Sequence, residues 1–359
     1  MALTQVDQGL LGTYAQYTGF KNRIINGAMV IDQRNAGASV TLTASTLYIV
    51  DRFGGVEDTD GGMTCQQVSQ APEGFTKSIV FTTTSADASL GSTQYCVGVQ
   101  RIEGNNVADL GWGTALAKTV TLSFWVRSSL TGTFSGSLVN SAADRSYPIT
   151  YTISAANTWE QKSVTVAGDT SGTWLTDNGI GIRVHFSLGS GSSYSGTAGA
   201  WASSLFFGAT GATSVVGTNG ATFYITGVQL EKGSTATSFD YRPYGTELQL
   251  AQRYFQKSYS IGIAVGSATA VGQLTTRIYN TDVYLPAVQQ RLPVTMRSSP
   301  TVTWYTTAGV SGSLNIGAGT NTINTPFDIN ESSTGWLYVN GAVASGSQVG
   351  GQYTASAEL

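Results

Sequence analysis

The stretch TFYITGVQLEKGSTATSFDYRPYGTELQLAQRYFQK, residues 222–257, begins as a β-strand and ends as the clearest helical pattern in the chain. Its first part fits a strand with one extra residue near Gly227, which predicts a β-bulge. The polar turn at residues 231–233 ends this strand. The apolar positions of the strand are Phe223, Ile225, Val228 and Leu230. We therefore expect a boundary between two β domains in this stretch.

A short helix is predicted after Pro243 and Gly245, where the run ELQLAQRYFQK has helical periodicity over about three turns. A single helix of this length is marginal in water, so we expect it to pack against a β domain, a neighbouring subunit or both. We predict a helical hinge over residues 244–258 whose apolar side serves oligomerisation. The residues assigned to that role are Leu248, Ala251, Tyr254 and Phe255.

The composition favours an all-β protein of two domains. The chain has 359 residues, 44 of them glycine, and only 11% are charged. A hydrophobic content of 41% and an aromatic content of 10% are too high for a disordered chain. We predict an antiparallel jelly-roll sandwich at residues 21–243, then the helix, then a smaller C-terminal β-sandwich at residues 259–359.

Charge and hydropathy argue against several classes of function. The formal net charge is −3, from 18 basic and 21 acidic residues without clustering, which offers no surface for nucleic acid. The N-terminal sequence has no secretion signal, and no apolar run is long enough to span a membrane. We expect synthesis in a reducing cytoplasm, where Cys65 and Cys96 remain buried free thiols.

Two predicted strands turn polar and aromatic side chains away from the core. In VTLSFWVRSS the alternation buries the apolar residues and turns Trp125 and Arg127 outward. In GIRVHFSL the same alternation turns Arg183 and His185 outward. Both pairs are therefore candidates for contact with a ligand or a neighbouring molecule.

Two segments lack a strand pattern. The insertion at residues 187–220 is rich in Gly, Ser and Thr and carries Tyr194 and Trp201, and a loop of this length is uncommon unless it is functional. Residues 1–20 include apolar residues at the spacing of a short helix. This segment fits an attachment or oligomerisation element and fits equally a frayed terminus.

Three stretches together resemble virion proteins of tailed bacteriophages, especially tail-fibre and receptor-binding proteins. They are NRIINGAMVIDQR with YIVDRFG, TLSFWVRSS, and the stretch that joins the domains. LPVTMRSSPTVTWY and YTASAEL are similar to the C-terminal domain that often follows in such proteins. Residues 22–241 also resemble the jelly-roll carbohydrate-binding modules of polysaccharide-degrading enzymes.

The resemblance implies a homotrimeric fibre or spike in the virion, attached to other virion proteins through residues 1–20 and adhering to a host cell. Carbohydrate-binding modules of this kind often hold calcium with an acidic residue in the last strand, where this chain has Thr226. The acidic segment DRFGGVEDTDGG lacks the spacing of an EF-hand loop. We therefore expect neither a metal ion nor a cofactor.

Catalysis has little support in the sequence. His185 is the only histidine, so a Ser-His-Asp or Cys-His arrangement would have to use it, and no nucleophile motif occurs. Glycoside hydrolysis needs only two carboxylates at a set separation, which a sequence cannot measure. The candidate carboxylates, which fit solvated turns better, are Asp51, Glu57, Glu103, Asp109, Asp144 and Glu160. We predict that the protein is not an enzyme.

Sugar binding has a physical basis in this composition. Flat aromatic rings stack on the C–H faces of sugars, while Arg, Asn, Gln, Ser and Thr hydrogen-bond the hydroxyls. The predicted glycan-binding residues are Trp125, Arg127, Arg183, His185, Tyr194 and Trp201. In the alternative, these aromatics are buried against neighbouring subunits of a purely structural head fibre, decoration or adaptor protein. A polysaccharide depolymerase is the third hypothesis.

Overall fold

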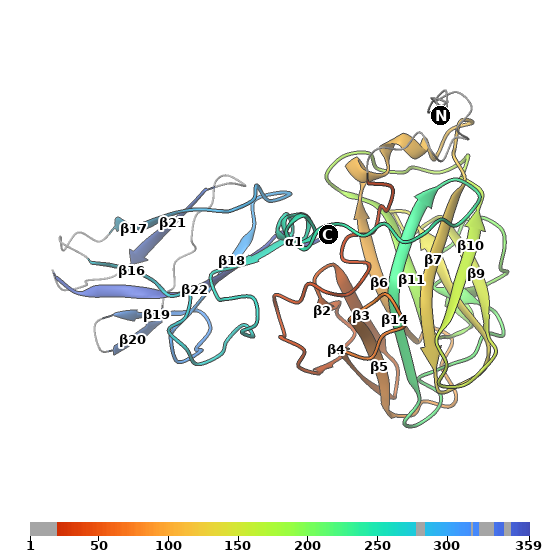
Figure 1. Cartoon of the computed structure of the whole chain (residues 1–359), viewed down its shortest axis with the longest axis horizontal. Helices are drawn as coiled ribbons and strands as arrows, with labels where there is room; N and C mark the ends of the chain where they lie inside the picture. Colours follow the sequence, from red (N-terminus) through yellow and green to blue (C-terminus); the bar gives the residue numbers. More distant parts are fainter. Residues whose placement is uncertain (1–19, 278–283, 317–318, 323–333, 341–345) are drawn as a thin grey trace, which may run out of the picture.

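The protein consists of two β domains joined by one short helix, α1 (Tyr244–Gln252), as Figure 1 shows. This computed structural model describes residues 20–277, 284–316, 319–322, 334–340 and 346–359. Apart from α1 and three short 3₁₀ turns, every regular element in those ranges is a strand. The all-β prediction is confirmed. The predicted N-terminal attachment segment lies outside the described residues except for Phe20.

The first domain is a sandwich of two antiparallel six-stranded sheets. The chain crosses repeatedly from one sheet to the other, as in a jelly roll. In order across the first sheet, called sheet A, the strands are β1 (Val40–Thr41), β4 (Gly62–Val68), β5 (Ser78–Ser85), β14 (Thr222–Lys232), β7 (Val120–Ser128) and β10 (Glu160–Val166). In order across the second, called sheet B, they are β2 (Leu47–Val50), β3 (Phe53–Asp58), β6 (Tyr95–Glu103), β11 (Ile180–Ser190), β8 (Gly132–Val139) and β9 (Ser146–Ile153).

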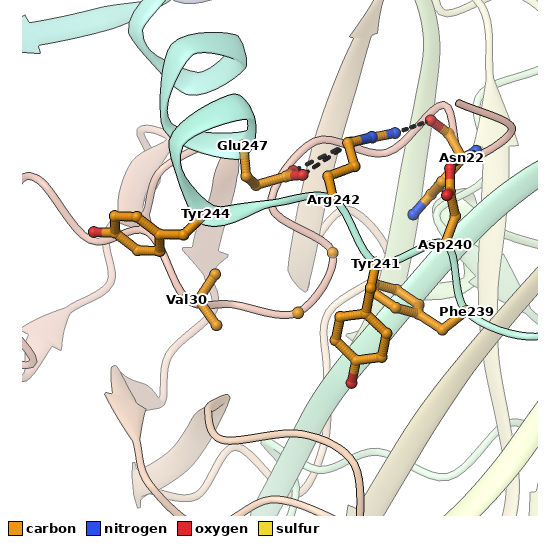
Figure 2. Close-up of a pocket in the computed structure, with 10 residues that line it drawn as sticks. Asn22, Val30, Phe239, Asp240, Tyr241, Arg242, Tyr244 and Glu247 are labelled. Atoms are coloured by element: carbon orange, nitrogen blue, oxygen red, sulfur yellow. Dashed lines mark hydrogen bonds and ion pairs between the residues drawn. The ribbon is translucent and has the colours of Figure 1, made fainter. Parts of the chain in front are cut away.

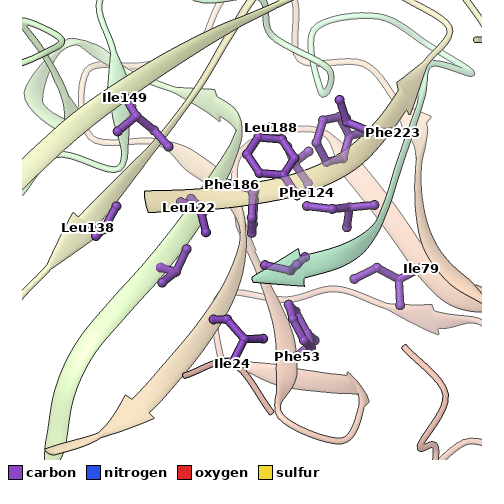
Figure 3. Packing of buried hydrophobic residues seen from close by; sticks show 14 of the residues in the cluster. Ile24, Phe53, Ile79, Leu122, Phe124, Leu138, Ile149, Phe186, Leu188 and Phe223 are labelled. Carbon is purple, nitrogen blue, oxygen red and sulfur yellow. The ribbon is translucent and has the colours of Figure 1, made fainter. Parts of the chain in front are cut away.

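The core of the jelly roll is formed by the inward side chains of both sheets. Leu122 and Phe124 of β7 are 0% exposed and face Phe186 and Leu188 of β11 across the sandwich (Figure 3). The Phe124 and Phe186 rings meet edge to face, with centroids 5.2 Å apart. Because burying one such side chain stabilises a fold by about 1.5–3 kcal/mol, this alternation fixes the register of the strands.

Strand β14 contains the predicted bulge. Its pairing with β7 shifts between Thr226 and Gln229, and Gly227 adopts a left-handed φ of 61°. The extra residue keeps Ile225 and Val228 on the same side of the sheet, and both are buried. A glycine is required at this point because other residues rarely adopt that backbone conformation.

The second domain is smaller and is organised around one long strand, β22 (Gln348–Ser356). Four strands pair with β22: β15 (Phe255–Lys257), β16 (Leu274–Arg277), β18 (Thr301–Tyr305) and β19 (Ser313–Ile316). Two further strand pairs are β19 with β20 (Gly319–Thr322) and β17 (Tyr284–Arg291) with β21 (Thr334–Asn340). Buried side chains including Trp304, Leu314 and Tyr353 form its own hydrophobic core.

The helix is shorter than the predicted hinge. It begins at Tyr244 and ends at Gln252, so Tyr254 and Phe255 lie beyond it, and Phe255 opens β15. Ala251, Tyr254 and Phe255 are at most 4% exposed within the single chain, where Ile25 and Ile31 help to cover this side. The assignment of these three residues to oligomerisation is therefore wrong, because the chain itself supplies the packing partner. Leu248 is half-buried in the same cluster, and its role in oligomerisation stays a prediction.

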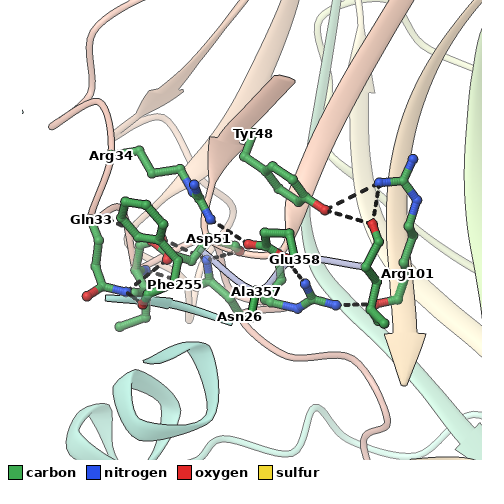
Figure 4. Close-up of polar contacts among 12 residues, drawn as sticks. Asn26, Gln33, Arg34, Tyr48, Asp51, Arg101, Phe255, Ala357 and Glu358 are labelled. Atoms are coloured by element: carbon green, nitrogen blue, oxygen red, sulfur yellow. Dashed lines mark hydrogen bonds and ion pairs between the residues drawn. The ribbon is translucent and has the colours of Figure 1, made fainter. Parts of the chain in front are cut away.

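Ion pairs join the two domains at their junction, as Figure 4 shows. The Glu358 carboxylate, just after β22, accepts hydrogen bonds from Arg34 at 2.5 Å and from the fully buried Arg52. Arg101 of β6 donates to the Leu359 carbonyl at 2.9 Å. Removing one partner of a buried ion pair costs about 3–5 kcal/mol, so these contacts hold the second domain against the jelly roll.

A buried carboxylate stabilises the same junction from the jelly-roll side. Asp51 accepts hydrogen bonds from the backbone and the side chain of Gln33, and the Gln33 side chain also donates to the Phe255 carbonyl. Burial raises the pKa of Asp51 to about 6.

Among the described residues, no helix is long and apolar enough to cross a membrane.

Candidate functional site

Aromatic and polar side chains gather on the outer face of sheet A. Trp125 and Arg127 leave β7 on this side, and Tyr224 lies opposite Arg127 on β14. On the other side of β7, Glu160 pairs with Val126, which puts Trp159 level with Arg127. All four side chains are half-buried and remain partly open to solvent. We call Trp125, Arg127, Trp159 and Tyr224 the sheet A platform.

Tyr224 contacts both Trp159 and Arg127, and Trp125 lies two residues before Arg127 on the same strand. The Trp159 and Tyr224 rings lie 6.0 Å apart at an interplanar angle of 72°. The Arg127 guanidinium carbon lies 4.9 Å from the centre of the Tyr224 ring, a cation–π contact. One guanidinium nitrogen reaches Gln70 Oε1 at 3.4 Å. The platform is therefore a contiguous patch in which ring faces stand beside hydrogen-bond donors.

A second aromatic group extends the platform toward the domain junction. A Cβ atom added at Gly227 would lie 2.7 Å from Phe75 Cζ and 3.0 Å from Trp125 Cδ1, so the two rings flank the bulge. Phe75 in turn contacts Phe239 at 5.1 Å and Tyr241 at 5.4 Å between ring centroids. Tyr241 is 55% exposed. Two aromatic groups, Trp159 with Tyr224 and Phe75 with Phe239 and Tyr241, thus lie on this side of the domain, with Trp125 and the bulge between them; together we call them the aromatic track.

The track ends at a pocket of about 190 Å³ beside α1. Figure 2 shows Tyr241 and Tyr244 on opposite sides of Val30, with Arg242 and Glu247 above them. The charged groups of the wall are paired with each other or with the backbone, since Arg242 bonds Glu247 at 3.2 Å and Asp240 accepts from two backbone amides. The residues that line the pocket are Asn22, Gly27, Ala28, Val30, Phe239, Asp240, Tyr241, Arg242, Tyr244 and Glu247.

The outer face of sheet B is covered, so His185 points away from the sandwich core but is not open to solvent, which contradicts its prediction as a glycan-binding residue. His185 is only 4% exposed, and its ring lies edge-on to Phe207 with centroids 5.1 Å apart. Phe207 belongs to the 187–220 insertion, which folds back onto β8, β9 and β11, and it forms a small second core with Val56 of β3 and Val97 of β6. Burial, with a smaller contribution from Arg183 and Arg101, lowers the pKa of His185 to about 3. His185 is therefore a neutral core residue.

Two other predicted glycan-binding residues, Arg183 of β11 and Tyr194 of the insertion, contact different partners. Tyr194 packs against Tyr95 at 5.2 Å and Phe207 at 5.0 Å. Arg183 is half-buried and donates to the Ser141 carbonyl at 2.8 Å. Each of these side chains has a partner within its own domain.

Trp201 joins the insertion to an aromatic cluster of the sandwich. Its ring meets Trp112, Trp174 and Tyr147 at centroid distances of 5.3, 5.4 and 5.2 Å. Its indole nitrogen donates to the Ala167 carbonyl at 2.8 Å. The long insertion is explained by this packing, because it buries rings against the sandwich.

Two residues of the platform, Tyr224 and Trp159, are absent from the predicted site. The alternation around Tyr224, between the buried Phe223 and Ile225, indicates that it points outward. Trp159 directly precedes a strand whose exposure also alternates. Both signals were present in the sequence, but the pairing of β14 and β10 with β7 was needed to join them to Arg127.

The candidate carboxylates are engaged in structural contacts. Glu103 binds Arg253 at 2.6 Å, Asp109 binds Arg23 at 2.9 Å, and Glu160 binds Lys162 at 2.5 Å. Asp144 accepts from Asn140 at 2.6 Å, and Glu57 accepts from the Thr59 amide at 3.0 Å. In the described ranges, no group of three or more His, Cys, Asp or Glu side chains could hold a metal ion.

Both cysteines are buried in the jelly roll. Cys65 and Cys96 are free thiols, and burial raises the pKa of each well above its usual value. A thiol in this state is a poor nucleophile, because the thiolate is the reactive form. Neither residue contributes to the candidate site.

The sequence matches no protein-family model and no curated protein. Among solved structures, the fold is similar to tailspike protein 4 of bacteriophage CBA120 at 14% identity and a TM-score of 0.29, over 59% of this chain and 21% of that chain. The match thus spans about a fifth of the tailspike chain. At this identity and TM-score, the similarity says nothing about what the protein binds or does.

Two carbohydrate-binding modules also match at this level. One is TmCBM61 in complex with β-1,4-galactotriose, at 10% identity and a TM-score of 0.28, over 59% of this chain and 99% of that chain. The other is a family 11 module from Clostridium thermocellum with a mixed-linked tetrasaccharide, at 14% identity and a TM-score of 0.28, over 53% of this chain and 96% of that chain. The function is therefore argued from the residues of this chain.

Proposed function

We propose that this protein is a non-enzymatic adhesin of a bacteriophage virion, a tail fibre or spike that binds host-surface glycans through the sheet A platform. The observation that carries the proposal is the accessible face formed by Trp125, Arg127, Trp159 and Tyr224, which combines ring faces with hydrogen-bond donors. Sugars present both apolar C–H faces and hydroxyl groups, so a glycan would satisfy both kinds of side chain at once.

The shape of the surface favours a linear glycan over a single sugar. The aromatic track continues past Gly227 to Phe75 and Tyr241, so several successive sugars could each meet a ring. Extended contact of this kind gives useful affinity from weak individual contacts, and a multimeric fibre would multiply it through avidity. We infer a homotrimer and an attachment role for residues 1–20 from the resemblance to phage fibres.

The proposal is tested with purified protein and a panel of bacterial surface polysaccharides. We expect binding to at least one polysaccharide and at least a tenfold loss of affinity in Trp125→Ala and in Trp159→Ala, which corresponds to about 1.4 kcal/mol each. Leu116→Ala, at a residue that is 72% exposed and away from the platform, is the matched control and should bind as the wild type does.

The same samples separate the two alternative functions. In a structural head fibre or decoration protein, no polysaccharide binds, and Trp125→Ala weakens the oligomer, because the platform then lies against a neighbouring subunit. A depolymerase releases reducing sugar from the polysaccharide that it binds. Either result would overturn the proposal that the protein is a non-enzymatic adhesin.

A further inference from the structure

Arg127 has no carboxylate partner among the described residues, unlike six other arginines of the chain. Its one hydrogen-bond acceptor is the neutral Gln70 side chain, at the long distance of 3.4 Å. The six arginines whose side chains pair with a described carboxylate are Arg23, Arg34, Arg52, Arg145, Arg242 and Arg253. Arg127 therefore brings an uncompensated positive charge to a surface.

The surroundings hold the Arg127 guanidinium in place without neutralising it. The group stacks on the Tyr224 ring, and its Nε atom is buried without a hydrogen-bond partner. Glu160 lies across the strand pair, but its carboxylate already binds Lys162 and the amides of Ser154 and Ala155. The terminal guanidinium nitrogens are thus left as donors beside the platform rings.

We propose that Arg127 binds a carboxylate of the ligand, so that the sheet A platform selects acidic glycans, such as polysaccharides that contain uronic acids. The inference rests on the proposed function and adds the charge of the sugar to it. A planar guanidinium pairs with a carboxylate through two parallel hydrogen bonds, which a hydroxyl group cannot reproduce. The cation–π contact with Tyr224 restrains the guanidinium, and Trp125, two residues earlier on the same strand, offers a ring for the sugar that carries the acid.

The test is an array of bacterial surface polysaccharides of known structure, half of them with uronic acids and half neutral. Each acidic polysaccharide that binds is then measured again after chemical reduction of its carboxyl groups to alcohols, which preserves the rest of the sugar. We expect acidic members to dominate the binders and their affinity to fall at least tenfold on carboxyl reduction. The affinity should also fall as salt is added, because the pair is partly solvated.

Two variants and one matched control assign the effect to Arg127. We expect Arg127→Gln to bind the acidic polysaccharide at least tenfold more weakly, and Arg127→Lys to recover only part of the loss, because an ammonium keeps the charge but not the fork. Arg277→Gln removes the same charge from an exposed residue of the other domain and should leave binding unchanged. Unchanged thermal unfolding of all three variants excludes misfolding as the cause.

The outcomes separate the two claims. If neutral polysaccharides bind as well as acidic ones, or if Arg127→Gln and Arg277→Gln have equal effects, the selection of acidic glycans is wrong and the adhesin proposal stands. If no polysaccharide binds at all, both are overturned.

Discussion

The two outer faces of the jelly roll share one sequence pattern, in which polar or aromatic residues alternate with core residues. One face is nevertheless open to solvent, and the other is covered. On sheet A, the outward residues of β7 remain open and form the sheet A platform. On sheet B, the outward residue His185 of β11 is buried beneath Phe207. Alternation along a strand predicts which side chains leave the core, but whether another segment covers them depends on the loops.

The difference is produced by the insertion that follows β11. Its Gly-rich composition lets it lie close to sheet B, where a Cβ atom at Gly208 would meet Ser135 Oγ at 2.5 Å. Among the described residues, no comparable insertion crosses the sheet A platform, where Trp125 and Phe75 flank the bulge at Gly227. One face is thus covered, and the other remains partly open to solvent.

The largest expected effect comes from uncovering sheet B. Phe207→Ala removes the ring that covers His185 and should lower the free energy of unfolding by about 3 kcal/mol, the usual cost of truncating a buried phenylalanine. Trp125→Ala on the open face should cost about 1 kcal/mol or less. Chemical denaturation measures both. Equal losses in the two variants would contradict the distinction between a covered and an open face.

A smaller effect is expected from the bulge that shapes the open face. Gly227→Ala adds a Cβ in a left-handed conformation, where it would lie 2.7 Å from Phe75 and 3.0 Å from Trp125. We expect a loss of stability of about 1–2 kcal/mol from the backbone strain, and weaker glycan binding because both rings must move. The measurements are thermal unfolding and titration with the polysaccharide.

Gly220→Ala is the matched control for the bulge. Gly220 also has a left-handed φ, of 73°, but nothing lies within 4 Å of its Cβ position. Gly220→Ala should therefore cause a similar backbone strain but leave glycan binding unchanged. A binding loss as large as that of Gly227→Ala would show that the ring contacts are irrelevant.

The smallest effect at neutral pH concerns pH dependence, and it comes from the covered face. The folded pKa of His185, about 3, lies below the unfolded value of about 6.5, so the unfolded state binds the extra proton between these values. The contribution of His185 to the free energy of unfolding is fully present above about pH 6.5 and is lost as the pH falls toward about 3. His185→Asn should remove this part of the slope of unfolding free energy against pH.

The buried Asp51 has the opposite sign and must be separated from His185. Its folded pKa, about 6, lies above the usual 3.8, so its contribution is present below about pH 3.8 and is lost as the pH rises through 6. The unfolding free energies with and without His185→Asn should therefore also be compared as a function of pH in protein that carries Asp51→Asn. Proton NMR of the only histidine gives an independent result, and titration of His185 near pH 6.5 would show that the face is open.

The strand pattern was sufficient to predict much of the fold and half of the platform. Alternating apolar residues located β7, β11 and β14, and the extra residue in β14 located the bulge at Gly227. Trp125 and Arg127 followed from the same alternation, because a buried strand face leaves only the other face for polar side chains.

The rest depended on contacts between distant segments. Nothing local to His185 indicates that Phe207 covers it, and nothing local to Arg127 indicates that Tyr224 and Trp159 join it from neighbouring strands. The helical periodicity of ELQLAQRYFQK extended beyond the true helix, because pairing with β22 draws Phe255 into a strand. Tertiary contacts override local propensity in each of these cases.

The most direct test of the open face is fluorine NMR of protein labelled with 5-fluorotryptophan, titrated with the polysaccharide that it binds. The chain has seven tryptophans, whose signals can be assigned by single Trp→Phe variants. We expect the signals of Trp125 and Trp159 to shift on binding, while those of Trp112, Trp174 and Trp201 stay in place. Shifts at Trp201 with none at Trp125 and Trp159 would contradict the account and place the ligand on the insertion.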